Sequence, residues 1–229
     1  MSGMRRIGRF RWPALIGVLL IGAACTETKY VPIRAEETGE RQSLPLERIV
    51  EFDRREELLT EPPGCVVVSP LETKTVSPAL ATLIEESAIR HLSVRVRRVI
   101  AGAFRDQQAR YHGIVLADPK GLPALARALG CDGIVEVRTT EAGATYAIFF
   151  ASYRMGLELR LVRVRDGLEL WRSRHLSQRM SGGVPVSLGV PVAAVSATSL
   201  ASDEEAVHSL VDEILRRLFS TWPSTRRLG

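Results

Sequence analysis

Short apolar runs separated by helical patterns most constrain the fold of this 229-residue chain. Residues 66–68 and 114–117 are continuous apolar runs, which is typical of strands buried on both faces, and residues 132–138 have the composition of a third strand. Between them, apolar residues recur every three to four positions over 80–104 and over 122–129, as in amphipathic helices. A helix between successive strands predicts parallel pairing through crossover connections.

The first helical pattern leaves two interpretations open. It is either one long helix or two helices with a break near Ser93, and periodicity alone does not decide between them. Ser77 and Pro78 supply an N-cap and a first-turn proline where the pattern begins. Gly130 stands where the second helix is expected to end.

The pattern changes to strand-like alternation in the second half of the chain. Leucines at every second position alternate with charged residues, and the apolar phase slips between Leu161 and Val162, which predicts a β-bulge. Asp166 and Gly167 form a strong two-residue hairpin signal before a partner strand over 168–176.

A last amphipathic helix follows a capping box made by Ser202 and Glu205 and stops at Trp222. The whole order is β-α-β-α-β, then a β-hairpin, then a helix. It predicts an α/β fold in three layers around a mixed five-stranded sheet.

The start of the chain has the features of a signal peptide. Residues 1–24 carry four arginines and no acidic residue, and residues 14–24 form an uncharged apolar stretch of 11 residues. A membrane-spanning helix needs roughly 20 apolar residues. The basic start, the short apolar stretch and the small residues before Cys25 therefore indicate a signal peptide rather than a membrane span.

Residues 21–25, with the sequence IGAAC, resemble the lipobox of bacterial lipoproteins. The resemblance implies cleavage between Ala24 and Cys25, diacylation of Cys25 and acylation of the new amino terminus. Gly22 departs from the usual leucine at its position. Thr26, rather than aspartate, follows the cysteine, and by resemblance to Gram-negative sorting this implies the periplasmic face of the outer membrane. The alternative is an ordinary secretory signal that leaves Cys25 as a free thiol.

The chain therefore divides into three predicted parts. They are a lipoprotein signal peptide over 1–24, a lipidated cysteine and tether over 25–61, and a periplasmic α/β domain over 62–229. Most of the tether is polar and without period, and apolar residues within 46–59 suggest a short amphipathic helix.

Four features of the domain occur in one order and carry a family resemblance. They are CVVVSPL at 65–71, LGCDGIV at 129–135, LRLVRVRDGLELW at 159–171, and the terminal helix. Over residues 62–222 the chain resembles the domain shared by the amino-terminal part of TolB, the curli-secretion lipoprotein and penicillin-binding-protein activator lipoproteins. The resemblance implies a mostly non-enzymatic role, in which members build envelope machines, export pores or docking platforms, often as rings.

Motifs for nucleophilic, metal or phosphate chemistry are absent from the sequence, which has no GxSxG, HExxH, P-loop or GxGxxG pattern. The four histidines lack metal-ligand spacing: His91, His112, His175 and His208. We expect His91 to be a core residue, and His175 and His208 to be surface residues. We expect no enzymatic activity, no metal and no cofactor.

One binding site can be inferred from the predicted topology. In open α/β sheets, ligands bind beyond the carboxyl ends of the strands, where the strand order reverses. The loop over 69–75 follows the first strand of the predicted domain, and the helix start at Ser77 could hold an anion. The alternative is a plain solvated loop.

Cys65 and Cys131 are each predicted to open a strand, and the two strands are predicted to be parallel neighbours. Neighbouring strands lie about 4.8 Å apart, which is within the Cα range of a disulfide. The periplasm is oxidising. The two residues either form a disulfide or are two buried thiols that point to different faces.

Residues 181–202 carry no charge and contain Val186 and Val192, each beside a proline. Three interpretations are open: a loop packed on the domain, an interface with a partner or another protomer, or a membrane-inserting hairpin like those of the curli pore. An aromatic patch either covers the core or joins the same interface, and its members are Tyr146, Phe149, Phe150 and Tyr153.

The net charge of +5 does not indicate a nucleic-acid partner. Without residues 1–24 the chain has 27 basic and 26 acidic residues, a net charge of +1. The sequence predicts a lipid-anchored, non-enzymatic binding or assembly component that holds a partner or its own copies at the outer membrane. The alternatives are a subunit of an outer-membrane export pore and an envelope enzyme of unknown reaction.

Overall fold

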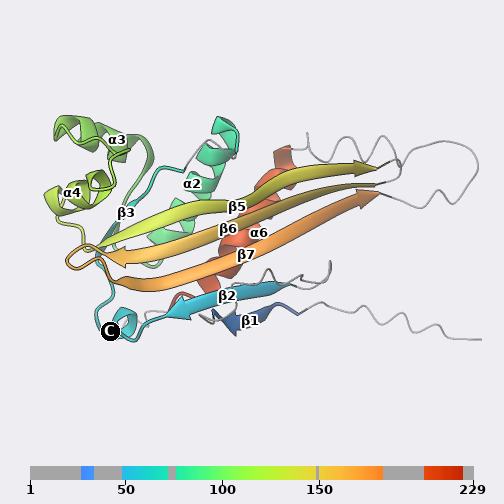
Figure 1. Cartoon of the computed structure of the whole chain (residues 1–229), viewed down its shortest axis with the longest axis horizontal. Coiled ribbons are helices and arrows are strands. Elements are labelled where there is room, and N and C mark those ends of the chain that lie inside the picture. Colours follow the sequence, from blue (N-terminus) through green and yellow to red (C-terminus); the bar gives the residue numbers. More distant parts are fainter. Residues whose placement is uncertain (1–26, 34–47, 72–75, 148–149, 183–203, 224–229) are drawn as a thin grey trace, which may run out of the picture.

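The computed structural model describes residues 27–33, 48–71, 76–147, 150–182 and 204–223. The elements run in the order β1 (Lys29–Pro32), β2 (Ile49–Arg54), α1 (Glu57–Thr60), β3 (Cys65–Val68), α2 (Pro78–Ser93), β4 (Arg98–Ile100), α3 (Gly102–Tyr111), α4 (Gly121–Ala128), β5 (Gly133–Ala147), β6 (Phe150–Arg163), β7 (Glu169–Gly182) and α6 (Glu204–Ser220) (Figure 1). Within these ranges, no helix combines the length and apolarity needed to cross a membrane.

Seven strands form one mixed sheet in the order β1-β2-β7-β6-β5-β3-β4. Strand β3 pairs in parallel with both β4 and β5, while β5, β6 and β7 form an antiparallel meander. Strand β2 is antiparallel to β7 and parallel to β1. The predicted α/β class and the parallel pairing of the strands that begin near Cys65 and Cys131 are confirmed, but five strands was too few.

The strand predicted over 114–117 is wrong, because these residues form turns after α3. The outer neighbour of β3 is instead β4, which follows α2. The break near Ser93 is the correct alternative for the long helical pattern, since α2 ends there and α3 begins at Gly102. Gly102 has a φ of +55°, a conformation that glycine adopts readily and that turns the chain from β4 into α3.

Strands β1 and β2 lie in the stretch predicted to be a tether with a helix over 46–59. The helix is confined to α1, and the residues before it pair with β7. Val50 is fully buried in the core, while Glu51 beside it points to the other face. The alternation of apolar and charged residues in β2 was the strand signal that the helical interpretation overlooked.

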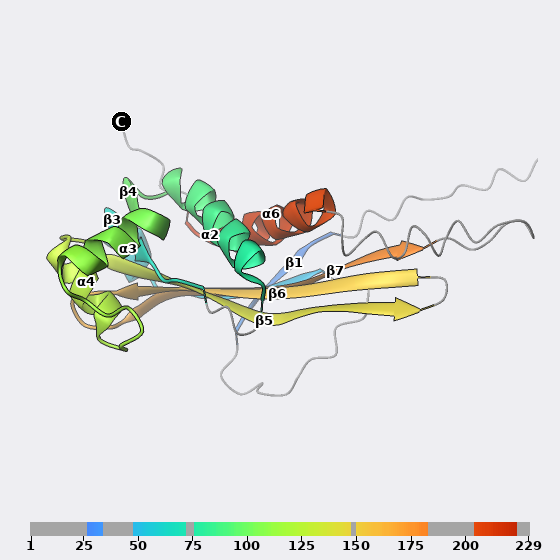
Figure 2. The same cartoon turned by 90° about the horizontal axis from the view of Figure 1, so that it is seen from above.

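Helices lie on both faces of the sheet, but the predicted three layers are present only around β3, β4 and the start of β5 (Figure 2). Helices α2 and α6 pack on one face against Val66, Val68 and the leucines of β6. Helices α3 and α4 pack on the other face against Val67 and Ile134. Because alternate residues of β3 enter different cores, all four of its side chains are buried, as its apolar composition predicts.

The local signals around the hairpin are largely confirmed. The register of β6 and β7 shifts between Leu161 and Val162, where the bulge was predicted. The connection is a five-residue loop over 164–168 rather than a two-residue turn, with Gly167 at a φ of +73°. Ser77 caps α2 by accepting a hydrogen bond from the Leu80 N–H, whereas Ser202 lies outside the described residues.

Candidate functional site

The strand directions define two ends of the sheet (Figure 1). Strand β7 runs towards Gly182, and β2 and β1 run against it, so the start of β1 points towards the end where β7 finishes but lies level with the middle of β7. We call this the strand-tip end, made of residues 143–147 of β5, 150–153 of β6 and 177–182 of β7. The opposite end, with α1, α3, α4 and the loop over 164–168, is the turn end.

The strand-tip end is uncharged in β5 and β6. Residues 143–147 and 150–153 contain no charged side chain, and the ladder between the two strands continues to the pair Ala147 and Phe150. An ion pair between Glu141 and Arg154, with 3.3 Å between Oε1 and Nε, stands at the boundary. The uncharged ends of β5 and β6 therefore extend beyond the ion pair of Glu141 and Arg154.

The structure brings two of the predicted interface segments to this end. Tyr146 lies in β5, and Phe150 and Tyr153 lie in β6. Gly182 pairs with Phe150, so the uncharged stretch over 181–202 starts beside the aromatic patch. Tyr153 is half-buried and packs against the core, and this burial raises its pKa. The other three predicted residues, Phe149, Val186 and Val192, lie outside the described residues.

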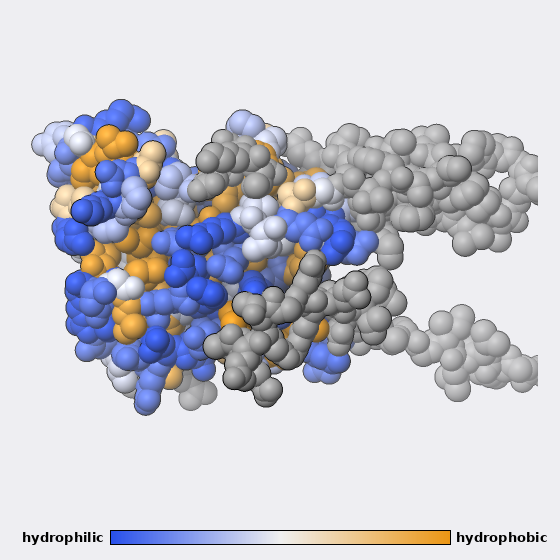
Figure 3. Space-filling model, viewed as in Figure 1, coloured by the Kyte–Doolittle hydropathy of each residue, from blue (hydrophilic) through white to orange (hydrophobic). Residues whose placement is uncertain are grey.

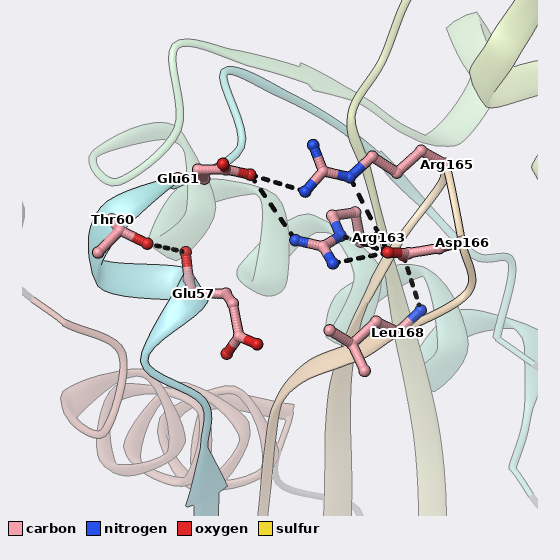
Figure 4. Close-up of polar contacts among 7 residues, drawn as sticks. All are labelled: Glu57, Thr60, Glu61, Arg163, Arg165, Asp166 and Leu168. Atoms are coloured by element: carbon pink, nitrogen blue, oxygen red, sulfur yellow. Dashed lines mark hydrogen bonds and ion pairs between the residues drawn. The ribbon is translucent and has the colours of Figure 1, made fainter.

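At the turn end, α1 is joined to the β6–β7 loop by a charged cluster (Figure 4). Glu61 contacts Arg165 at 2.8 Å and Arg163 at 3.7 Å. Asp166 accepts hydrogen bonds from Arg163 and from the Leu168 N–H, and these lower its pKa to about 2. These exposed ion pairs join the residue after α1 to the β6–β7 loop.

Helix α3 and the segment after it expose apolar side chains at the same end. Phe104, Tyr111 and Val115 are 48%, 81% and 67% exposed. Phe104 belonged to the predicted core pattern, but α3 is a separate helix whose buried residues are Arg105 and Ala109. Residues 95–128 contain seven basic and two acidic residues, so this apolar surface lies within a basic region.

The open face of the sheet carries charges in complementary rows. Figure 3 shows it as largely hydrophilic, with apolar groups near α3 and α4. Neighbouring strands place acids beside arginines, and Arg160, for example, contacts both Glu169 and Glu136. Across β2, β7, β6 and β5 the rows are Asp53, Arg172, Arg160 and Glu136, then Glu51, Arg174, Glu158 and Arg138. The charges balance, as expected for a solvated face.

Arg105 occupies the carboxyl end of β3, where the topology suggested a ligand site. Its NH1 donates to the carbonyl oxygen of Val68 at 3.1 Å and to Glu85 Oε1 at 2.6 Å. Glu85 also accepts a hydrogen bond from the Gly102 N–H at 2.7 Å. Residues 72–75 of the predicted loop lie outside the described residues. The described polar groups at this point bind one another and hold β3, α2 and α3 together.

His175 is 3% exposed, so the prediction that it is a surface residue is wrong. Its Nδ1 contacts the carbonyl oxygen of Ile49 at 2.6 Å, and its Nε2 contacts Arg217 NH1 at 3.0 Å. Burial lowers its pKa to about 4, and the Arg217 charge acts in the same direction. Since Arg217 can only donate, Nε2 accepts and Nδ1 donates, which assigns a neutral ring.

The other histidines have structural surroundings or lie at the surface. His91 is largely buried, contacts Asp212 at 3.1 Å and stacks on the ring of Phe219, which agrees with its predicted place in the core. His208 is exposed, as predicted. Among the described residues, no three His, Cys, Asp or Glu side chains are grouped in a way that could hold a metal ion.

Cys65 and Cys131 lie side by side where β3 begins and just before β5. Their sulfur atoms are 1.93 Å apart and their Cα atoms 4.6 Å apart, which is the arrangement of a disulfide. The Asp132 N–H donates to the carbonyl oxygen of Cys65 at 3.1 Å. Both side chains belong to the core beneath α3 and α4, so they point to the same face.

No protein-family model and no curated protein matches the sequence. Similar solved structures include the PelC dodecamer of Paraburkholderia phytofirmans, with 14% identity, coverage of 75% of this chain and 94% of that chain, and a TM-score of 0.47. Lipoprotein GNA1162 from Neisseria meningitidis has 21% identity, 62% and 99% coverage and a TM-score of 0.42. The LpoB C-terminal domain from Salmonella enterica has 15% identity, 53% and 90% coverage and a TM-score of 0.36. Likenesses this distant carry no function over to this chain.

Proposed function

We propose that this chain is a lipid-anchored, non-enzymatic component of the bacterial envelope that holds a partner at the periplasmic face of the outer membrane. The position of β1 carries the proposal. Lys29 opens this strand only four residues after Cys25. Four extended residues span at most about 14 Å, so acyl chains on Cys25 would hold the strand-tip end close to the lipid.

The turn end then faces away from the membrane. Its best surface for a partner is α3, because Phe104 and Tyr111 are exposed aromatic side chains in a basic region. Aromatic and arginine side chains contribute most to protein interfaces, and complementary charge speeds association. A protein that presents carboxylates around an apolar side chain fits this surface.

The anchor is tested by intact mass and membrane fractionation after expression in a Gram-negative host. The mature chain should begin at Cys25 and carry a diacylglyceryl group and an acyl chain. A Cys25→Ala variant should lose the added mass. A bare Cys25 on a chain in the soluble periplasm would contradict the proposal.

Position 26 provides a second, matched comparison. Thr26→Asp should keep the acyl mass but move the protein to the inner membrane, because aspartate after the lipidated cysteine resembles the retention signal. Thr26→Ser should change neither mass nor location. Equal distribution of the two variants would remove the outer-membrane assignment and leave the anchor intact.

A further inference from the structure

We propose that the uncharged ends of β5 and β6, residues 143–147 and 150–153, contact the lipid of the leaflet that holds the anchor. This contact rests on the proposed function, because the anchor supplies the membrane and fixes which end of the sheet faces it. It differs from a docking surface for a protein, since its occupant is the lipid surface itself.

The direction of the strands places anchor and strand ends on one side of the molecule. Lys29 pairs with Ile49, and the next residue of β2, Val50, pairs with His175. From His175 the strand β7 continues for seven residues to Gly182, beside Phe150, a distance of roughly 23 Å. Cys25 lies up to about 14 Å beyond Lys29, so lipid chains on it reach a comparable depth.

The length of the uncharged strand ends suits one leaflet. From Arg154 to Phe150, β6 advances four residues, or roughly 13 Å. Half of a hydrocarbon core of about 30 Å is about 15 Å, so these ends could not pass beyond one leaflet even if they were fully inserted. The ion pair of Glu141 and Arg154 would remain at the polar surface.

The residue types are those of a membrane interface. Tyr146, Phe150 and Tyr153 belong to the aromatic types that gather at the boundary between lipid and water. No carboxylate or basic group among the two strand ends would have to lose its hydration. On β7, Arg179 pairs with Tyr153, so only a shallow contact at the level of the headgroups avoids a large electrostatic cost.

The backbone pairing determines how deep the contact goes. Up to Phe150, β6 pairs with β5 on one side and with β7 on the other, so its N–H and C=O groups are satisfied. In this region β5 has a described partner only in β6. An open strand edge is costly in hydrocarbon, because its polar groups find no water. The strand ends therefore lie in the boundary between headgroups and acyl chains, not in the bilayer centre.

The test uses the chain with Cys25→Ala and without residues 1–24, so that neither an acyl chain nor the apolar signal peptide contributes. The purified protein is floated with vesicles of phosphatidylethanolamine and phosphatidylglycerol. We expect it to float with the vesicles and to keep doing so in about 0.5 M salt, since the contact is apolar and not a surface ion pair. Phe150→Glu in this background should lower the floating fraction at least about fivefold, because a buried carboxylate is expensive.

The matched control is Val94→Glu, which places a carboxylate at a 79% exposed apolar position outside the strand-tip end. It should float like the Cys25→Ala parent. Phe150→Ser, with circular dichroism and thermal unfolding of each variant, separates lost lipid contact from lost folding. The proposal is overturned if the Cys25→Ala parent does not float with the vesicles. It is also overturned if Phe150→Glu and Phe150→Ser float as well as the parent, or if Phe150→Glu abolishes self-association and leaves flotation unchanged. The mass of the wild-type chain reports on the anchor independently, so the two proposals can fail separately.

Discussion

At the scale of single residues, His175 joins three elements through one ring. It lies on β7, contacts the Ile49 backbone of β2 and accepts from Arg217 of α6. Arg217 is itself buried and pairs with Glu213. These bonds hold β2 against the body of the sheet, which explains why a titratable group is kept in an apolar environment.

The lowered pKa of His175 predicts that stability decreases in mild acid. The unfolded chain binds a proton near pH 6.5, whereas the folded chain resists protonation until about pH 4. The stabilisation is therefore complete above the unfolded pKa and is lost as the pH falls towards the folded one. Between about pH 7.5 and pH 5 the free energy of unfolding should fall by about 2 kcal/mol from this residue.

Urea unfolding at the two pH values measures this loss. His175→Gln, which does not titrate, should be less stable at neutral pH but should show a smaller change with pH. His208→Gln, at an exposed position of α6, is the control and should keep the wild-type pH dependence. An unchanged pH dependence in His175→Gln would show that another group is responsible.

Arg105 is the second residue with a large expected effect. It is 3% exposed and ion-paired with Glu85, so Arg105→Met removes the positive charge beside the Glu85 carboxylate, which keeps only the Gly102 N–H, and removes a donor to the Val68 carbonyl. Breaking a buried pair costs about 3–5 kcal/mol. Denaturant unfolding should show a loss in this range, and Arg110→Met on the exposed face of α3 should change stability by less than about 0.5 kcal/mol. A small effect of Arg105→Met would mean that the pair contributes little.

At the scale of elements, the cysteine pair joins the starts of β3 and β5 across a separation of 66 residues. We propose that it is bridged in the oxidising periplasm. In the chain-entropy model such a bridge contributes about 4 kcal/mol. Reduction should therefore lower the Tm of the wild-type chain, and the double variant Cys65→Ala and Cys131→Ala should have a lower Tm that a reductant does not change. Equal Tm values with and without reductant would argue for free thiols.

The edge strands β1 and β2 provide another prediction at this scale. If residues 49–54 belong to the folded sheet, Val50→Ala should cost about 1–3 kcal/mol, because Val50 is fully buried. Val31→Ala, at a partly buried position of the outer strand β1, should cost less. A tether would tolerate both changes equally, so denaturant unfolding of the two variants separates the interpretations.

At the scale of the whole molecule, the chain has two unlike ends. The strand-tip end has the uncharged ends of β5 and β6, towards which the start of β1 points, and the turn end combines exposed aromatic side chains with a basic region. If the anchor is present, the long axis of the sheet points away from the bilayer (Figure 2). The partner surface would then stand clear of the lipid.

Lipid-quenching of single fluorescent labels measures this orientation. A label at Lys29→Cys on the lipidated protein should be quenched by spin-labelled lipids, and a label at Tyr111→Cys should not. Strong quenching at position 111 would place the turn end on the membrane and contradict the proposed orientation. The native cysteine pair is expected to be bridged and unreactive, and the unlabelled wild-type chain provides the background.

Some features of the fold and the site could be predicted because they depend on neighbours in the sequence. The cap at Ser77, the bulge after Leu161 and the end of α4 before Gly130 each depend on a few adjacent side chains or one backbone conformation. The burial of β3 follows from its continuous valines. The aromatic patch was identified from the residue types in the sequence. The structure shows on which strands its described members lie.

Other features required the tertiary structure. Whether residues 49–54 pair with β7, and whether His175 is buried, depends on partners more than 120 residues away. Arg105 contacts the carboxyl end of β3 because α3 begins at Gly102. The helical periodicity of the sequence did not show where this second helix begins.

The sequence by itself therefore determined the α/β class, the alternation of helices and strands and the candidate lipid anchor, because periodicity, turn chemistry and motifs act over short separations. Only the tertiary structure decided the seven-strand order and the direction of the β1 start towards the uncharged strand ends. Strand pairing and burial join distant segments, and local propensity carries no information about which distant segments meet.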